Sequence, residues 1–143
     1  MARVFQSRLP RSVIITIALL FPVASTATAG TPFVLERVND GGGNDVGEYA
    51  SLALDAAGNP HIAYDDASAA DLYYAKKCGG TWNTEAVDLG NLVGSHATLA
   101  LDSQGVPHIC YYNAETGNLR YATKPAGVWV TEVVDASPNA TGY

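Results

Sequence analysis

Short stretches of alternating apolar and polar residues recur along this chain, separated by groups of turn-forming residues. In the first of them, Leu52 and Leu54 fall on one side and Ala53 on the other, which is the period of a half-buried β-strand. The strands predicted in this way are Ser51–Asp55, His61–Asp65, Leu72–Lys76 and Trp82–Val87. No helical period follows residue 29, so the pattern predicts an all-β protein.

The predicted strands are connected by turns with recognisable chemistry. Asp55 begins the first turn, where its side chain can accept backbone N–H groups and Gly58 can adopt a positive φ. Asp66–Asp71 is a polar turn, and Gly79-Gly80 marks a tight turn before Trp82. Each predicted strand is therefore followed directly by its antiparallel neighbour.

The whole set of four strands occurs twice. Residues 50–96 and 97–143 align without a gap and share 21 of 47 residues. A repeat of this length with four strands is typical of one blade of a β-propeller. The alternative is an eight-stranded β-sandwich, which does not require such a constant period.

Residues 30–49 match the end of a repeat. Phe33, Glu36 and Val38 correspond to Trp82, Glu85 and Val87, and the Gly-rich segment Asp40–Glu48 follows as a loop. We therefore expect two full blades of 47 residues preceded by one N-terminal outer strand, which is an incomplete propeller. Two interpretations follow: a truncated piece of a longer propeller, or a ring formed by several chains, in which the extra outer strand would be surplus.

Residues 1–29 have the pattern of a signal peptide. Arg3, Arg8 and Arg11 precede the apolar run Val13–Val23, and Ala27-Thr28-Ala29 provides the small residues of a cleavage site before Gly30. The run is shorter than the roughly 20 residues that span a bilayer, so a membrane anchor is the weaker interpretation. We expect a secreted or periplasmic protein without membrane attachment after cleavage.

Charge and cysteine content narrow the classes of partner. After residue 29 the chain has five basic and fourteen acidic residues, a formal net charge of −9, which disfavours nucleic acid and anionic membranes. Cationic ligands are compatible with this charge. Cys78 is expected in a loop and Cys110 as a small buried residue, although one disulfide between them is the alternative in an oxidising compartment.

The repeated pattern LALDxxGxPHIxYxx…LxYAxKxxGxWxxExVD resembles the blades of secreted bacterial propeller proteins, and is distantly similar to sialidase-type (BNR/Asp-box) propellers. The resemblance implies blades. It does not imply sialidase activity, because the SxDxGxxW turn keeps only Gly79 before Trp82, and Arg37 and Arg120 are the only arginines after residue 29.

The recurring polar residues are interpreted as framework. His61 and His108 occupy equivalent strand positions, and Asp55 and Asp102 equivalent turns, so structural roles are favoured over metal binding or acid–base catalysis.

Positions where the copies differ are better candidates for specificity, because one end of a propeller gathers the connections between blades and between the second and third strands. The candidate ligand-binding residues are Asp65, Asp66, Asp71, Tyr112, Asn113 and Asn118. We expect a polar small molecule or glycan there, and neither cofactor nor metal. The expected function is that of a non-catalytic binding or scaffold module, with a fragment of a secreted glycoside hydrolase and a lectin-like oligomeric ring as alternatives.

Overall fold

The computed structural model describes residues 34–39 and 41–137, and the described residues from Leu35 onward belong to one compact unit. The expected leader lies outside the described residues. The elements are η1 (Gly41–Gly43), β1 (Val46–Leu54), β2 (Pro60–Asp66), β3 (Asp71–Cys78), β4 (Thr81–Asp88), β5 (Val93–Leu101), β6 (Pro107–Asn113), β7 (Asn118–Thr123) and β8 (Val130–Asp135).

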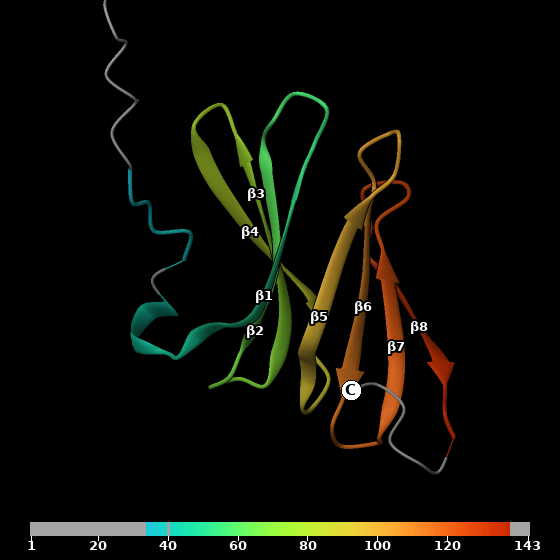
Figure 1. The fold of residues 1–143 in the computed structure, drawn as a ribbon. Helices are drawn as coiled ribbons and strands as arrows, with labels where there is room; N and C mark the ends of the chain where they lie inside the picture. The colour runs from blue at the N-terminus through green and yellow to red at the C-terminus, as the bar shows by residue number, and fades with distance from the viewer. Residues whose placement is uncertain (1–33, 40, 138–143) are drawn as a thin grey trace, which may run out of the picture. The chain divides into compact units, whose positions relative to one another are not determined.

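The eight strands form two separate four-stranded antiparallel sheets (Figure 1). Sheet 1 has the order β1-β2-β3-β4 and sheet 2 the order β5-β6-β7-β8, so each strand pairs with its neighbours in sequence. Turn chemistry explains this order. Asp55 Oδ1 accepts the backbone N–H groups of Ala57 and Asn59 at 2.9 and 2.8 Å, and Asp102 does the same in the second repeat. The all-β prediction and the four strands per repeat are confirmed.

Two boundaries differ from the sequence prediction. β1 and β5 begin at Val46 and Val93, within segments that were expected to be loops. Gly47 and Gly94 adopt φ values of 102° and 107°, and the strand register shifts beside them, so the apolar alternation is broken although the strands continue. The N-terminal outer strand was expected within residues 30–39; residues 30–33 lie outside the described part of the chain, and residues 34–39 are not in a strand.

Each sheet has two chemically distinct faces. We call the face of sheet 1 that carries Leu52 and Leu54, and the equivalent face of sheet 2 with Leu99 and Leu101, the leucine face. The opposite face is the histidine face, named for His61 in sheet 1 and its equivalent in sheet 2. The histidine face carries His61, Ala63, Tyr74 and Glu85 in sheet 1 and His108, Cys110, Tyr121 and Glu132 in sheet 2.

The leucine face of sheet 2 packs on the histidine face of sheet 1, and this contact forms the core. Its fully buried members include Ala63 and Leu72 from sheet 1 and Ile109 and Ala122 from sheet 2, all at 0% exposure. β5 approaches sheet 1 so closely that a Cβ on Gly94 would lie 3.1 Å from Leu72 Cα. Burial of apolar area between the sheets is therefore the main stabilising contribution.

Polar contacts also join the histidine face of sheet 1 to the leucine face of sheet 2. Asp88, at the end of β4, accepts a 2.6 Å hydrogen bond from the Tyr111 hydroxyl and lies 3.0 Å from the Arg120 guanidinium. Lys124, just after β7, forms an ion pair with Glu85 of β4. All three contacts join the last strand of sheet 1 to the leucine face of sheet 2.

The segment before η1 makes counterparts of two of these contacts, those of Lys124 and Tyr111, on sheet 1. Lys77, the equivalent of Lys124, donates to Glu36 Oε1 at 2.6 Å, and Asn39 donates to the Tyr64 hydroxyl at 3.0 Å. Since Tyr64 corresponds to Tyr111, the segment from Glu36 to Asn39 covers sheet 1 as β4 covers sheet 2, without forming a strand.

The outer faces remain open, and this corrects the expectation for Cys110. Cys110 is exposed, because it lies on the uncovered histidine face of sheet 2, whereas its equivalent Ala63 is fully buried. Cys78 is also exposed, and neither cysteine forms a disulfide. No helix within the described part of the chain is long and apolar enough to cross a membrane.

The stacking makes a prediction about two equivalent isoleucines. Ile109 is fully buried between the sheets, and Ile62 lies on the partly open leucine face of sheet 1. Ile109→Ala should lower the free energy of unfolding by about 2–5 kcal/mol, because it leaves a cavity in the core. Ile62→Ala is the matched control and should cost less than half as much. Urea denaturation measures both, and equal losses would contradict the stacking.

Candidate functional site

A cleft of about 370 Å³ lies between the two sheets, at the end where β1 and β5 begin. We call it the rim cleft. Its polar lining consists of Glu48, Tyr49, Asp65, Ser95, His96 and Tyr112. The connections before the first strand of each repeat and those between its second and third strands, which were expected to carry specificity, contribute residues to this lining.

The rim cleft is built from equivalent positions of the two repeats that hold different residues. Glu48 pairs with Asp65 across β1 and β2, and at the same positions Ser95 pairs with Tyr112 across β5 and β6. One side of the cleft is therefore acidic and the other neutral, although the backbone framework is shared.

Strained backbone brings the aromatic side chains of the cleft together. Tyr49 and His96 are equivalent residues with φ values of 48° and 56°, a conformation that non-glycine residues adopt at a cost of about 1–3 kcal/mol. Their ring centroids are 4.6 Å apart, and the rings of His96 and Tyr112 are 6.5 Å apart in an edge-on arrangement. These rings provide flat surfaces beside the carboxylates, suited to a sugar ring or an organic cation.

Asp65 is the least satisfied polar group of the cleft. Asp65 is 9% exposed, and its Oδ1 has no hydrogen-bond partner among the described residues. Burial, followed by the nearby charge of Glu48, raises the pKa of the Asp65 carboxyl from 3.8 to about 6. A buried carboxylate oxygen without a partner is costly, and a donor or cation placed in the cleft would relieve that cost.

The structure separates the six candidate residues into two groups. Asp65 and Tyr112 line the rim cleft. Asp66 and Asn113 instead cap the turns that follow, where each side-chain oxygen accepts backbone N–H groups two or three residues later. Asp71 and Asn118 pair with these capping residues at the starts of β3 and β7 and are not in the cleft lining.

Four polar residues of the cleft were not among the sequence candidates: Glu48, Tyr49, Ser95 and His96. Val-Gly-Glu-Tyr-Ala at residues 46–50 and Val-Gly-Ser-His-Ala at residues 93–97 do contain a signal. The repeated glycine marks the shared kinked strand, and the two variable residues after it mark the positions that enter the cleft.

Recurring His–Tyr pairs form a second polar feature, located within the framework. His61 Nδ1 bonds to the Tyr74 hydroxyl, and its Nε2 lies 3.6 Å from Asp55; His108, Tyr121 and Asp102 repeat the arrangement with a distance of 3.7 Å. Burial lowers the pKa of His61, so the ring is neutral near pH 7. The repetition, together with the burial of His61, fits the structural role expected for these histidines.

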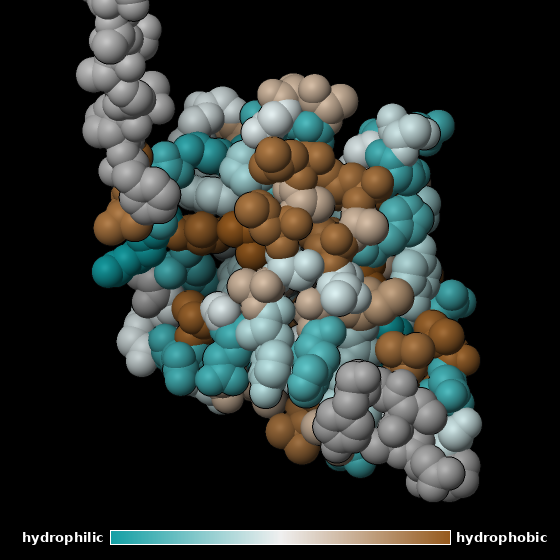
Figure 2. All heavy atoms as spheres, viewed as in Figure 1, coloured by the Kyte–Doolittle hydropathy of each residue, from teal (hydrophilic) through white to brown (hydrophobic). Residues whose placement is uncertain are grey.

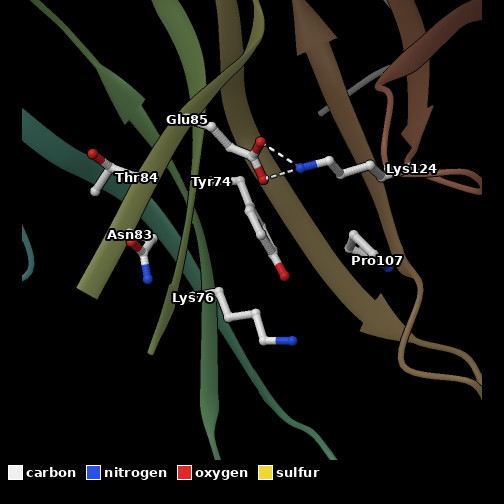
Figure 3. A pocket seen from close by; sticks show the side chains of 8 residues that line it. Tyr74, Lys76, Asn83, Thr84, Glu85, Pro107 and Lys124 are labelled. Atoms are coloured by element: carbon white, nitrogen blue, oxygen red, sulfur yellow. Dashed lines mark hydrogen bonds and ion pairs between the residues drawn. The ribbon is translucent and has the colours of Figure 1, made fainter. Parts of the chain in front are cut away.

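A larger cavity of about 440 Å³ lies between β3 and β4 of sheet 1 and the turns of sheet 2. Figure 3 shows Glu85 and Lys124 facing each other across it, with the Tyr74 ring extending between them and Lys76. Its charged residues already serve the stacking of the sheets through the ion pair, so we assign no ligand to this cavity.

Neither metal ligation nor similarity to known proteins adds a role. Within the described ranges, no group of three or more His, Cys, Asp or Glu side chains is arranged to hold a metal ion. Comparison with protein-family models, curated proteins and solved structures finds no match to the chain.

The raised pKa of Asp65 predicts how stability depends on pH. The folded state binds the proton more tightly than the unfolded state, so Asp65 reduces stability as the pH rises from about 4 to beyond 6. Asp65→Asn should therefore increase the free energy of unfolding at pH 7 by about 2 kcal/mol, with little change at pH 4. Urea denaturation at both pH values tests this, with Glu115→Gln, at an exposed turn position outside the cleft lining, as control. A loss of stability at pH 7 would show that Asp65 is satisfied in the fold.

Proposed function

We propose that the two sheets are propeller-type blades, and that the chain is an exported, non-catalytic binding module. Support comes from the sequential order of strands in each sheet and from the face-to-face packing of two sheets related by the sequence repeat. The inter-sheet contacts of Lys124 and Tyr111, which recur at Lys77 and Tyr64, also favour a series of similar units.

The ligand we assign to the rim cleft is a small polar molecule that carries a cationic group, such as an amino sugar. The observation that carries this assignment is the unpartnered Oδ1 of buried Asp65 in the cleft. Glu48 adds a second negative charge, and the rings of Tyr49, His96 and Tyr112 provide apolar surface beside it. An ammonium group would satisfy the carboxylate while the rest of the molecule contacts the rings.

A glycoside hydrolase function has less support. Sialidase chemistry would need a cluster of arginines, but Arg37 and Arg120 are the only ones after residue 29, and Arg120 is engaged by Asp88 and lies over the ring of Tyr111 between the sheets. The acidic rim cleft favours the opposite charge in its ligand. Binding without turnover is therefore the function that we propose.

Two sugars that differ in one group test the proposal. Glucosamine should bind at pH 7 roughly tenfold more tightly than glucose, because only its ammonium group forms a charge-assisted bond with Asp65. NMR titration of the full chain measures both affinities and should place the shifts on the rim cleft.

Asp65→Asn should abolish the difference between the two sugars, while Glu115→Gln removes one negative charge at the same end of the sheets and should preserve it. Equal affinity for both sugars, or a preference that survives Asp65→Asn, would refute the cationic ligand. Hydrolysis of a glycoside panel by the chain would refute the non-catalytic role.

A further inference from the structure

The two open faces of the molecule correspond to the two faces that are packed together between the sheets. The histidine face is covered in sheet 1 and open in sheet 2, and the leucine face is covered in sheet 2 and partly open in sheet 1. The internal contact therefore shows which surface fits each open face, because the repeat places equivalent residues on both.

The exposed fractions of equivalent residues show how much more open each outer face is than its packed counterpart. On the histidine side, Val87 is 8% exposed and its equivalent Val134 is 56% exposed, while buried Ala63 corresponds to exposed Cys110. On the leucine side, Leu99 packs against the core, whereas its equivalent Leu52 is 62% exposed and Leu54 is 60% exposed. Figure 2 shows apolar side chains gathered on the side where β1 and β5 lie in front.

We propose that copies of this chain associate head to tail, with the histidine face of sheet 2 in one copy docking on the leucine face of sheet 1 in the next. The internal interface between the sheets is the template for this contact. A second copy is the occupant because its open histidine face retains side chains that the packed one uses: His108, Tyr121, Glu132 and Val134 stand where the packed face has His61, Tyr74, Glu85 and Val87. The proposal is independent of the ligand assigned to the rim cleft.

Charge supports the same pairing. Glu132 is exposed on the open histidine face and corresponds to Glu85, which pairs with Lys124 inside the chain. Lys77, the equivalent of Lys124, lies on the leucine face of sheet 1, and its ammonium group forms an ion pair with Glu36 of the same chain. In the assembly Glu132 of the incoming copy takes the place of Glu36, so the segment from Glu36 to Asn39 competes with the second copy.

A contact between two different faces repeats from copy to copy until it closes a ring or extends as a filament. Each copy contributes two sheets, and closed propellers have typically 4–8 blades, so a ring would contain about two to four copies. Glu36→Gln should strengthen the association, because it weakens the competing segment.

Sedimentation velocity of the full chain over a range of concentrations tests the association. The mass should rise reversibly above the 15.0 kDa of one chain, and Leu52→Ser should weaken the association roughly tenfold or more, because it removes an apolar anchor. Val128→Ser is the matched control: Val128 is 68% exposed on the turn before β8, outside both faces, and its loss should change nothing. A chain that stays monomeric, or equal effects of the two variants, would overturn the proposal.

Two further readouts identify the faces involved. Lys77→Glu and Glu132→Lys should each weaken self-association, and mixing the two variants should restore it through the reversed ion pair. Cys110 should lose thiol reactivity as the copies associate, while Cys78, exposed at the end of β3, stays reactive. Failure of the mixture to associate, or equal protection of both cysteines, would place the contact elsewhere.

Discussion

Neither four-stranded sheet can bury its apolar residues alone, and the rest of the structure depends on this constraint. A single antiparallel sheet has two faces and no interior, so Leu72, Tyr74 and Ile109 leave water only when one sheet lies on the other. Stacking in turn creates the rim cleft, because the cleft is the space left where β1 and β5 begin. The site is thus a consequence of how the two halves pack.

Electrostatics at the site opposes the packing that creates it. Asp65 is buried by the stacking of the sheets, yet its Oδ1 gains no partner there, and Glu48 adds a like charge beside it. The strained backbone at Tyr49 and His96 is a second local cost, since the framework holds both residues at positive φ, a conformation that they do not prefer. Such local costs are typical of positions kept for binding and not for stability.

The sequence predicted the repeated framework well and the site only in part. Alternation and turn chemistry located all eight strands, because Asp55 and Asp102 act on their own local backbone. The early starts of β1 and β5 were missed, since the kinks at Gly47 and Gly94 interrupt the period that marks a strand. Among the candidate residues, Asp66 and Asn113 proved to be turn caps, because an acidic or amide side chain looks the same in sequence whether it faces a ligand or its own turn.

The short segment from Glu36 to Asn39 shows that recognition between neighbouring sheets does not require a paired strand. Side-chain contacts of Glu36 with Lys77 and Trp82, and of Asn39 with Tyr64, hold it where β4 lies on the other repeat. Each 47-residue unit carries both partners of the lysine–glutamate and tyrosine–aspartate contacts, with Glu and Asp in its last strand and Tyr and Lys in or just after its middle strands. Duplication or loss of a whole unit in the gene would therefore change the number of sheets without any new interface having to evolve.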